Sequence, residues 1–363
     1  MENNKLDIDR KEINEIDREM AELFVKRMQA VEIVAEYKKE RGLAILDEKR
    51  EEEIIKRNAD FVENEVLREY YIGFLRGNMA VSRAYQSRLL EGMKVAFSGT
   101  EGAFAHIAAS KLYPSAEKIA FGDFKSAYLA VENGECDIAV LPVENSYNGE
   151  VGQVTDLMFS GSLYVNGMFD LPITQDLLAK PGTKIEDIRE VVSHPQAFGQ
   201  YAEYIKRHGF ARHEFANTAL AAKWVAESAD QSIAAIGSRE AAHIFGLEVI
   251  DHDINESKSN STKFAIFSKV ANKRIDKDGG VHSILLFTVR NEAGALARAI
   301  EIIGRHGFNM RTLRSRPMKE LLWQYYFYVE VEGNIQSEAG DSLMNSLNEY
   351  CDKLRFAGTY IRL

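Results

Sequence analysis

Basic side chains interrupt the apolar face of the first predicted helix. That face has the three- and four-residue spacing of a helix side that packs against a core; it runs through Leu6, Ile13, Ile16, Met20, Leu23, Val31 and Val34. Arg10, Arg27 and Lys38 fall on the same face. Burying an unpaired cation is costly, so these residues indicate either a bound anionic ligand or side chains that snorkel at a helix seam. This helix alone leaves both interpretations open.

Further polar residues follow on the next two helical stretches. Asp47, Arg50 and Glu51 open the second stretch, where the carboxylates also suit the positive end of a helix dipole. Ser82 and Gln86 lie four residues apart on one side of the third stretch. That side is otherwise apolar, with Leu75, Met79 and Leu89. The alternative to a ligand site here is a satisfied polar pair in a helical core.

A second group of chemically useful residues lies at predicted strand ends in the middle of the chain. Residues 95–104 combine a strand, a glycine-bearing loop and a helix start, which offers backbone N–H groups to an anion. The spacing is not that of a dinucleotide or phosphate-loop motif, so we expect no nucleotide. Polar residues recur in four further segments: 142–146, 193–196, 217–218 and 260–264.

Three predicted units position these residues. Residues 1–91 contain three helical stretches, broken near Arg41-Gly42 and near 58–60, and predict an all-α domain. Residues 93–270 alternate short β-rich runs with alanine-rich helical stretches and predict an α/β domain. A polar linker at 271–280 precedes a strand–helix–strand–strand–helix–strand pattern at 281–363, which predicts an α+β domain.

Composition excludes several classes of function. The 363 residues exceed one ordinary core, and 45% hydrophobic with 28% charged residues is typical of a folded, soluble protein. The net charge of −10 argues against nucleic acid, and an anionic substrate would need a local basic pocket. Without a membrane-length apolar run we expect a cytoplasmic protein. Neither Cys136 and Cys351 nor His208 and His213 have metal-site spacing, so we predict no metal.

The N-terminal polar residues resemble those of the all-helical chorismate mutases across the whole of the first domain. The matching residues, in order, are Arg10, Arg27, Lys38, Asp47, Arg50, Glu51, Ser82 and Gln86. The resemblance implies that the three arginines surround the carboxylates and ring of chorismate, and that Lys38 and Gln86 hydrogen-bond its ether oxygen. This pericyclic rearrangement needs no nucleophile and no cofactor, only a held conformer and stabilised charge on the breaking bond.

Helix geometry adds an expectation about assembly. Arg27 and Lys38 are eleven residues apart, so on one helix they point the same way about 16 Å apart and can grip one ligand. Arg10 lies about 26 Å from Arg27 along the axis and must serve another chain's site. We therefore expect a homodimer or higher oligomer in which Arg10 of one protomer completes its partner's pocket. By the resemblance, Glu51 of that pocket takes a substrate hydroxyl.

The middle segments together resemble prephenate dehydratases over 93–270. That resemblance implies two α/β lobes of the solute-binding-protein type with the site in the cleft between them. It also implies roles for Asn145, Ser193, Gln200 and Thr262, with Thr262 most closely tied to turnover. Prephenate must lose carbon dioxide and hydroxide, for which a weak acid suffices. Thr262 can act directly or through water, and His194 is the alternative acid.

One position departs from the dehydratase pattern. The family usually has Thr-Arg-Phe where this chain has Thr262-Lys263-Phe264. Lysine keeps the charge but lacks the fork that suits a carboxylate, so we expect activity to be retained while substrate affinity or preference differs. Arogenate, the aminated relative of prephenate, stays an alternative substrate.

The C-terminal domain resembles the ACT domain attached to prephenate dehydratases. The resemblance rests on two short segments and the aromatic run 323–328: the segments are Gly294, Ala295, Leu296 and Arg314, Ser315, Arg316, Pro317. It implies phenylalanine binding between paired domains and feedback inhibition, with a coupling of about 1–3 kcal/mol. Arg314 stands where the family commonly has glutamate, which reverses one local charge.

The sequence thus predicts a bifunctional enzyme of phenylalanine biosynthesis, acting on chorismate and prephenate, with phenylalanine as effector. Two alternatives stay open. One is a binding or sensor protein that uses the two lobes as a solute receptor. The other is a mutase whose dehydratase half has decayed through the change at Lys263.

Overall fold

The computed structural model describes residues 2–254, 260–272, 280–318 and 324–363. Most of the predicted linker and Trp323 of the aromatic run lie outside these residues. The chain forms two compact units, Met1–Met93 and Lys94–Leu363.

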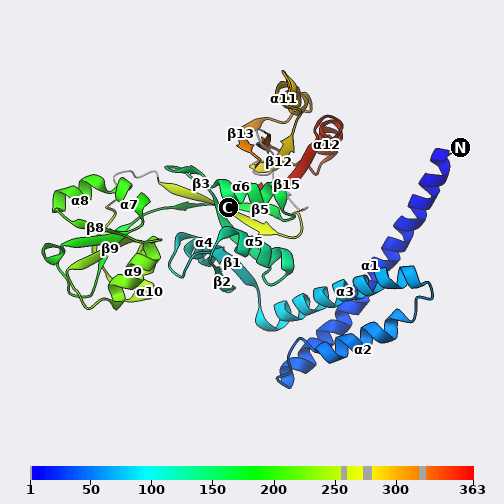
Figure 1. Cartoon of the computed structure of the whole chain (residues 1–363), viewed down its shortest axis with the longest axis horizontal. Helices are drawn as coiled ribbons and strands as arrows, with labels where there is room; N and C mark the ends of the chain where they lie inside the picture. The colour runs from blue at the N-terminus through cyan, green and yellow to red at the C-terminus, as the bar shows by residue number, and fades with distance from the viewer. Residues whose placement is uncertain (1, 255–259, 273–279, 319–323) are drawn as a thin grey trace. The chain divides into compact units, whose positions relative to one another are not determined.

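Three helices make up the first unit (Figure 1): α1 Glu2–Glu40, α2 Glu48–Ala59 and α3 Glu65–Glu91. Two of them begin at side-chain caps, since Asp47 accepts a hydrogen bond from the backbone N–H of Arg50 and Asn64 accepts one from Leu67. Such caps satisfy N–H groups that have no partner within the helix. The all-α prediction is confirmed.

The apolar face predicted on α1 is not buried within this chain. Ile13, Met20 and Leu23 are 56%, 44% and 63% exposed, and of the face only Val31 is partly buried. The prediction of a buried face is wrong for a single chain. The physical reason is length: α1 has 39 residues and α3 has 27, so α3 and the short α2 cannot cover the N-terminal half of α1.

The second unit contains two α/β lobes and a C-terminal α+β part. The first lobe has a mixed sheet in the order β2-β1-β3-β11-β5, with β4 paired to β3. Its strands are β1 Lys94–Ser98, β2 Glu117–Phe121, β3 Ile138–Asn145, β4 Gly149–Glu150, β5 Tyr164–Pro172 and β11 Ser261–Ser268. Its helices are α4 Phe104–Leu112, α5 Phe124–Asn133 and α6 Gly152–Ser160.

The second lobe has a sheet in the order β10-β6-β9-β7-β8. Its strands are β6 Asp176–Ala179, β7 Glu190–Ser193, β8 Ala211–Glu214, β9 Ile233–Gly237 and β10 Glu248–Asp251. Its helices are the short η1 Ile185–Asp187, then α7 Pro195–Gln200, α8 Ala202–His208, α9 Thr218–Glu227 and α10 Arg239–Phe245. The chain enters this lobe after β5 and returns before β11, which confirms the predicted two-lobed arrangement.

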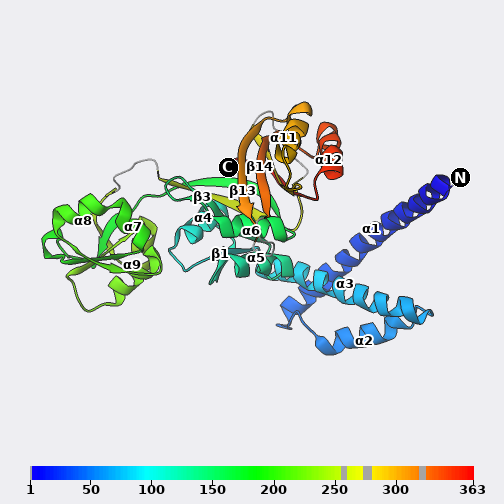
Figure 2. The ribbon, with the colours of Figure 1, turned by 45° about the horizontal axis from the view of Figure 1, so that its top comes forward.

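The C-terminal part has the predicted order of elements, with a sheet in the order β13-β14-β12-β15. They are β12 Val281–Thr288, α11 Ala295–Arg305, β13 Met310–Pro317, β14 Tyr325–Glu332, α12 Glu338–Tyr350 and β15 Lys353–Ile361. Both helices cover one face of the sheet (Figure 2). Leu285 and Phe287 of β12 pack toward them, whereas Ile284 and Leu286 point to the opposite face, as strand alternation requires.

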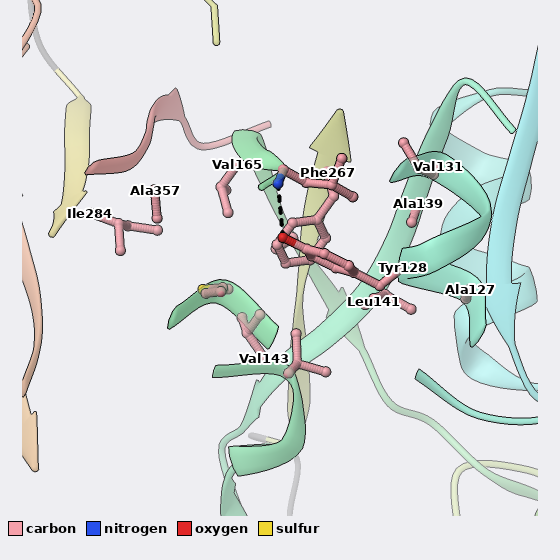
Figure 3. Close-up of a cluster of buried hydrophobic side chains, with 14 of the residues drawn as sticks. Ala127, Tyr128, Val131, Ala139, Leu141, Val143, Val165, Phe267, Ile284 and Ala357 are labelled. Atoms are coloured by element: carbon pink, nitrogen blue, oxygen red, sulfur yellow. Dashed lines mark hydrogen bonds between the residues drawn. The ribbon is translucent and has the colours of Figure 1, made fainter. Parts of the chain in front are cut away.

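That opposite face packs on the first lobe. Figure 3 shows Ile284 and Ala357 of the C-terminal sheet in one hydrophobic cluster with Val165 of β5 and Tyr128 of α5. The Tyr128 hydroxyl, buried in this cluster, accepts a hydrogen bond of 2.9 Å from the backbone N–H of Leu163. The C-terminal sheet therefore shares a core with strands β3, β5 and β11 of the first lobe.

Candidate functional site

A cavity of about 700 Å³ lies where the two lobes meet. Asn145 and Thr262 line it from the ends of β3 and β11 in the first lobe. His194 and Gln200 line it from α7 and its approach in the second lobe. The structure therefore brings three of the four predicted dehydratase residues, Asn145, Thr262 and Gln200, to one cavity.

A row of hydrogen bonds joins these residues. Asn145 and Thr262 are direct cross-strand partners, and Asn145 Nδ2 donates to Thr262 Oγ1 at 2.9 Å. Asn145 Nδ2 also lies 3.0 Å from Asn260 Oδ1, and Asn260 Nδ2 donates to Gln200 Oε1 at 3.0 Å. Asn260 is a site residue that the sequence reasoning missed, although it begins the segment that contains Thr262. Its buried amide connects the lobes.

The oxygen and the nitrogen of the Asn145 side-chain amide make different hydrogen bonds. Its Oδ1 accepts the backbone N–H groups of Tyr147 and Asn148 at 3.0 and 2.9 Å, which holds the turn after β3. Its Nδ2 occupies an acceptor position of Thr262 Oγ1. Among the described residues no group accepts the Thr262 hydroxyl proton, so that proton can be donated to a molecule in the cavity.

The fourth predicted residue lies elsewhere. Ser193 is fully buried, and its Oγ donates to the backbone carbonyl of Ile236 at 2.8 Å within the second sheet. It does not line the cavity among the described residues. His194 does line it, and burial lowers the pKa of this imidazole although Glu214 opposes the shift. A neutral imidazole is favoured, which makes His194 a weaker proton donor than a charged one.

No lysine or arginine lines the cavity among the described residues, so the basic pocket expected for an anionic substrate is not found in this cleft. Helix N-termini take its place. Phe104 and Ala105, in the first turn of α4, line the cavity, and the preceding Ala103 supplies no side-chain cap. Thr218, the first residue of α9, lines it from the other lobe. N–H groups in the first turn of a helix and the positive end of its dipole favour a carboxylate without a cationic side chain, although at α9 the cap Asn217 already accepts the N–H of Leu220.

The glycine loop contributes less than predicted. The backbone N–H of Gly99 donates to the carbonyl of Phe121 at 2.8 Å, and that of Gly102 donates to His106 Nδ1 at 3.2 Å. Both glycines have positive φ, so they shape the turn. An anion in the cavity would instead meet the first turn of α4, where Phe104 and Ala105 line the cavity.

Lys263 faces away from the cavity, which corrects the expectation that it meets the substrate. Its Nζ lies 3.2 Å from Glu144 Oε2. The reason is strand alternation: Thr262 and Phe264 line the cavity, so the side chain between them points to the other face of the sheet.

In the helical unit, three predicted residues meet around one polar spot. The Arg27 guanidinium donates to Ser82 Oγ, which itself donates to the carbonyl of Asn78 at 2.8 Å. Gln86 Nε2 donates to the carbonyl of Ser82 at 3.3 Å, whereas Gln86 Oε1 is buried with no partner in the described part of the chain. A buried polar atom without a partner is costly, which fits a site that a polar ligand completes.

The remaining predicted residues of this unit have other partners. Lys38 Nζ donates to the carbonyl of Ile45 at 2.5 Å, and both oxygens of Glu51 accept from Arg83 at 2.5 Å. Arg83 was not predicted. Within the described part of the chain, three residues have local partners only: Asp47 caps α2, Arg50 lies 3.4 Å from Glu53, and Arg10 lies 4.0 Å from Asp7 on the exposed part of α1.

The predicted effector residues lie on two elements. Gly294 has a positive φ and directly precedes α11 at its N-cap, and within the helix Ala295 is buried and Leu296 partly buried. On β13, Ser315 and Pro317 are exposed, whereas Arg316 faces the first lobe with its Nε 3.0 Å from Asp156 Oδ1. Burial by itself lowers the pKa of Arg316, but the hydrogen bond that it donates to Asp156 and the attraction of Asp156, Glu150 and Tyr326 outweigh burial and raise this pKa, so the guanidinium stays charged.

No cluster of metal-binding side chains occurs in the described ranges. Within the same residues, none of the helices has the length and apolar character needed to cross a membrane.

Comparison with known proteins decides the family. The family model for chorismate mutase type II matches residues 9–87, that for prephenate dehydratase matches 95–272, and that for the ACT domain matches 283–348. A bifunctional chorismate mutase/prephenate dehydratase from Neisseria gonorrhoeae is 30% identical over 97% of this chain and 95% of the relative. This chain belongs to the bifunctional chorismate mutase/prephenate dehydratase family.

Two further proteins are similar to part of this family member. The arogenate dehydratase/prephenate dehydratase 2 of Arabidopsis thaliana is 31% identical over 74% of this chain and 72% of its own length. The structure of a prephenate dehydratase from Arthrobacter aurescens in complex with L-Phe has a TM-score of 0.68 and 26% identity, covering 74% of this chain and 90% of that one. The predicted enzyme class is confirmed, and the reading as a non-catalytic receptor is not supported.

Proposed function

We propose that the domain 1–91 converts chorismate to prephenate and the domain 93–270 converts prephenate to phenylpyruvate, with 281–363 as the regulatory domain. The observation that carries the proposal is the hydrogen-bonded row in the cleft, because it presents one uncommitted hydroxyl, that of Thr262, between two lobes that can enclose a small molecule.

In the dehydratase cleft, we propose that the helix N-termini bind the substrate and that the Thr262 hydroxyl is the proton donor. The carboxylates of prephenate bind at the first turns of α4 and α9, where N–H groups replace hydration. As the ring carboxylate leaves as carbon dioxide, the electrons of the broken C–C bond move into the ring, and the hydroxyl group on the opposite ring carbon leaves as hydroxide. The Thr262 hydroxyl donates a hydrogen bond to that leaving group, directly or through a water. Asn145 aims the hydroxyl, and Gln200 supports Asn145 through Asn260.

In the helical unit, we assign chorismate binding to the polar spot around Arg27, Ser82 and Gln86, with Lys38 at the other end of the ligand. Arg10 reaches this pocket from a second copy of the chain, and Arg50 and Asp47 stay binding candidates from the resemblance alone. The exposed apolar face of α1 supports a homodimer, because a contiguous apolar stripe on a long helix suits a second copy.

We also propose that phenylalanine is the effector. The support is the ACT domain and the L-Phe bound to the relative from Arthrobacter aurescens. The site would use Gly294, Ala295 and Leu296 with Ser315 and Pro317, since the Arg316 side chain is engaged with Asp156. Calorimetry tests this: phenylalanine should bind and tyrosine should not. A cytoplasmic location stays a prediction from composition.

One experiment tests the two activities. Purified protein is incubated with chorismate while prephenate and phenylpyruvate are quantified, and prephenate and arogenate are compared as direct substrates. Full conversion is expected. Prephenate alone would favour a decayed dehydratase half, and no product would contradict both assignments. Thr262→Ala should abolish phenylpyruvate formation and leave chorismate consumption unchanged; an equal loss of both would contradict the two-site assignment.

A further inference from the structure

One strand of the ACT domain presents two cations to the dehydratase domain. Along β13, Arg314 and Arg316 are partly buried and face the first lobe, while Ser315 between them is exposed. Arg316 contacts α6 and β4, where its guanidinium lies within 3.6 Å of Glu150. Any side chain at Gly152 would overlap this guanidinium, so the close approach depends on that glycine. The ACT strand thus abuts the back of segments that line the cleft.

Arg314 belongs to a three-residue ion cluster. Its guanidinium hydrogen-bonds Glu144 Oε1, while Lys263 Nζ lies 3.2 Å from the other carboxylate oxygen of Glu144. All three side chains are only 20–31% exposed. Burial by itself raises the pKa of Glu144, but attraction to Arg314 and Lys263 outweighs it and lowers the pKa below the ordinary 4.5. Glu144 is therefore ionised and holds two cations that would otherwise repel each other.

Two residues of this cluster are sequence neighbours of the proposed catalytic pair: Glu144 precedes Asn145 on β3, and Lys263 follows Thr262 on β11. Lys263 and Glu144 are cross-strand partners, as are the adjacent Thr262 and Asn145. Successive residues of a strand point to opposite faces. The same two-residue ladder therefore presents Asn145 and Thr262 to the cleft and Glu144 and Lys263 to the ACT domain. A shift of the cluster must move the backbone that carries Thr262.

We propose that Arg314 is a positioning residue for the dehydratase reaction: from the ACT domain, through Glu144 and Lys263, it holds the Asn145–Thr262 pair in its catalytic alignment. The inference rests on the proposed role of Thr262. It also gives the two departures from the family pattern, Lys263 and Arg314, a common explanation, since both cations share one carboxylate.

The test compares two arginines of the same strand. Arg311 also lies on β13, but its partner is Glu332 within the ACT domain, so Arg311→Gln is the matched control. Arg314→Gln should lower kcat for prephenate about 10-fold and leave KM within about twofold, because misplacement of a catalytic group affects turnover more than binding. Arg314→Lys should keep at least about half of kcat, since it retains the charge opposite Glu144. Mutase activity should not change in any variant.

A double variant sharpens the test. Glu144→Gln alone leaves Lys263 and Arg314 as unpaired, half-buried cations, so it should lower kcat more than Arg314→Gln does. Adding Arg314→Gln to Glu144→Gln removes one of those cations and should restore part of the activity. If the two residues acted independently, the double variant would instead show the sum of the two losses.

Three results would overturn the proposal. The first is Arg314→Gln with the same kcat as Arg311→Gln. The second is Arg314→Lys as inactive as Arg314→Gln while both unfold at the temperature of the unsubstituted protein. The third is purely additive losses in the double variant. If the unsubstituted protein makes no phenylpyruvate from prephenate, the proposed function itself fails, and the inference fails with it.

Discussion

The mutase pocket should be a composite of two chains, and the unbroken α1 makes this testable. The helix runs without interruption from Glu2 to Glu40. Arg10 and Arg27 are seventeen residues apart, so at 1.5 Å per residue about 26 Å of axis separates them. Chorismate is far smaller than that span. Arg27 contacts Ser82 of its own chain, whereas Arg10 contacts only Asp7 among the described residues.

The expected magnitude follows from symmetry. Arg10→Ala and Arg27→Ala should each leave little mutase activity as pure proteins. When equal amounts are unfolded and refolded together, about half of the dimers are mixed, and in each mixed dimer one pocket carries both lesions and the other carries neither. About a quarter of all pockets is therefore intact, and about a quarter of the unsubstituted mutase activity should return.

The assay is chorismate consumption after refolding, with mixed dimers quantified through two different affinity tags. Arg27→Ala mixed with Lys38→Ala is the matched control. Both residues belong to the same pocket of the same chain, so every pocket of a mixed dimer keeps one lesion and no activity should return. Arg10 acts within its own chain if the Arg10→Ala and Arg27→Ala mixture stays inactive although mixed dimers form.

Three further outcomes follow from the structure. Lys263→Arg should leave the KM for prephenate unchanged, because this side chain faces Glu144 and not the cleft; a lower KM in steady-state kinetics would contradict that placement. Tyr128→Phe should lower the free energy of unfolding by about 1–3 kcal/mol in urea titrations, since it leaves the buried N–H of Leu163 without an acceptor; the exposed Tyr147→Phe is the control and should change nothing. Stability should fall as the pH drops below the ordinary histidine pKa of 6.5, because the unfolded chain then binds protons that the folded protein does not bind. Thermal midpoints that stay constant as the pH is lowered from neutral to acidic would refute this. Burial lowers the pKa of three histidines: His106, His194 and His282.

Local patterns were enough for the elements and their order. The continuous periodicity of residues 6–40 predicted one long helix, and Asp47 before Glu48 is a usual cap, because both effects act within a few residues of chain. The segments at 142–146 and 260–264 were readable as polar runs at strand ends, but their shared site followed only from the family resemblance; they meet because β3 and β11 are antiparallel, so the end of β3 lies beside the start of β11. The family resemblance then supplied the chemistry.

Tertiary structure alone decided which face of each element meets which partner. Strand alternation separates Thr262 from Lys263, but only the packing of the two lobes shows that the cleft is on the Thr262 side. The sequence shows that α1 has an apolar face, but its periodicity does not tell whether residues of the same chain bury that face. Arg314 and Glu144 are 170 residues apart, and an ion pair across that separation has no local signature. Periodicity reports the faces of an element, whereas the contacts between faces arise from packing of the whole chain.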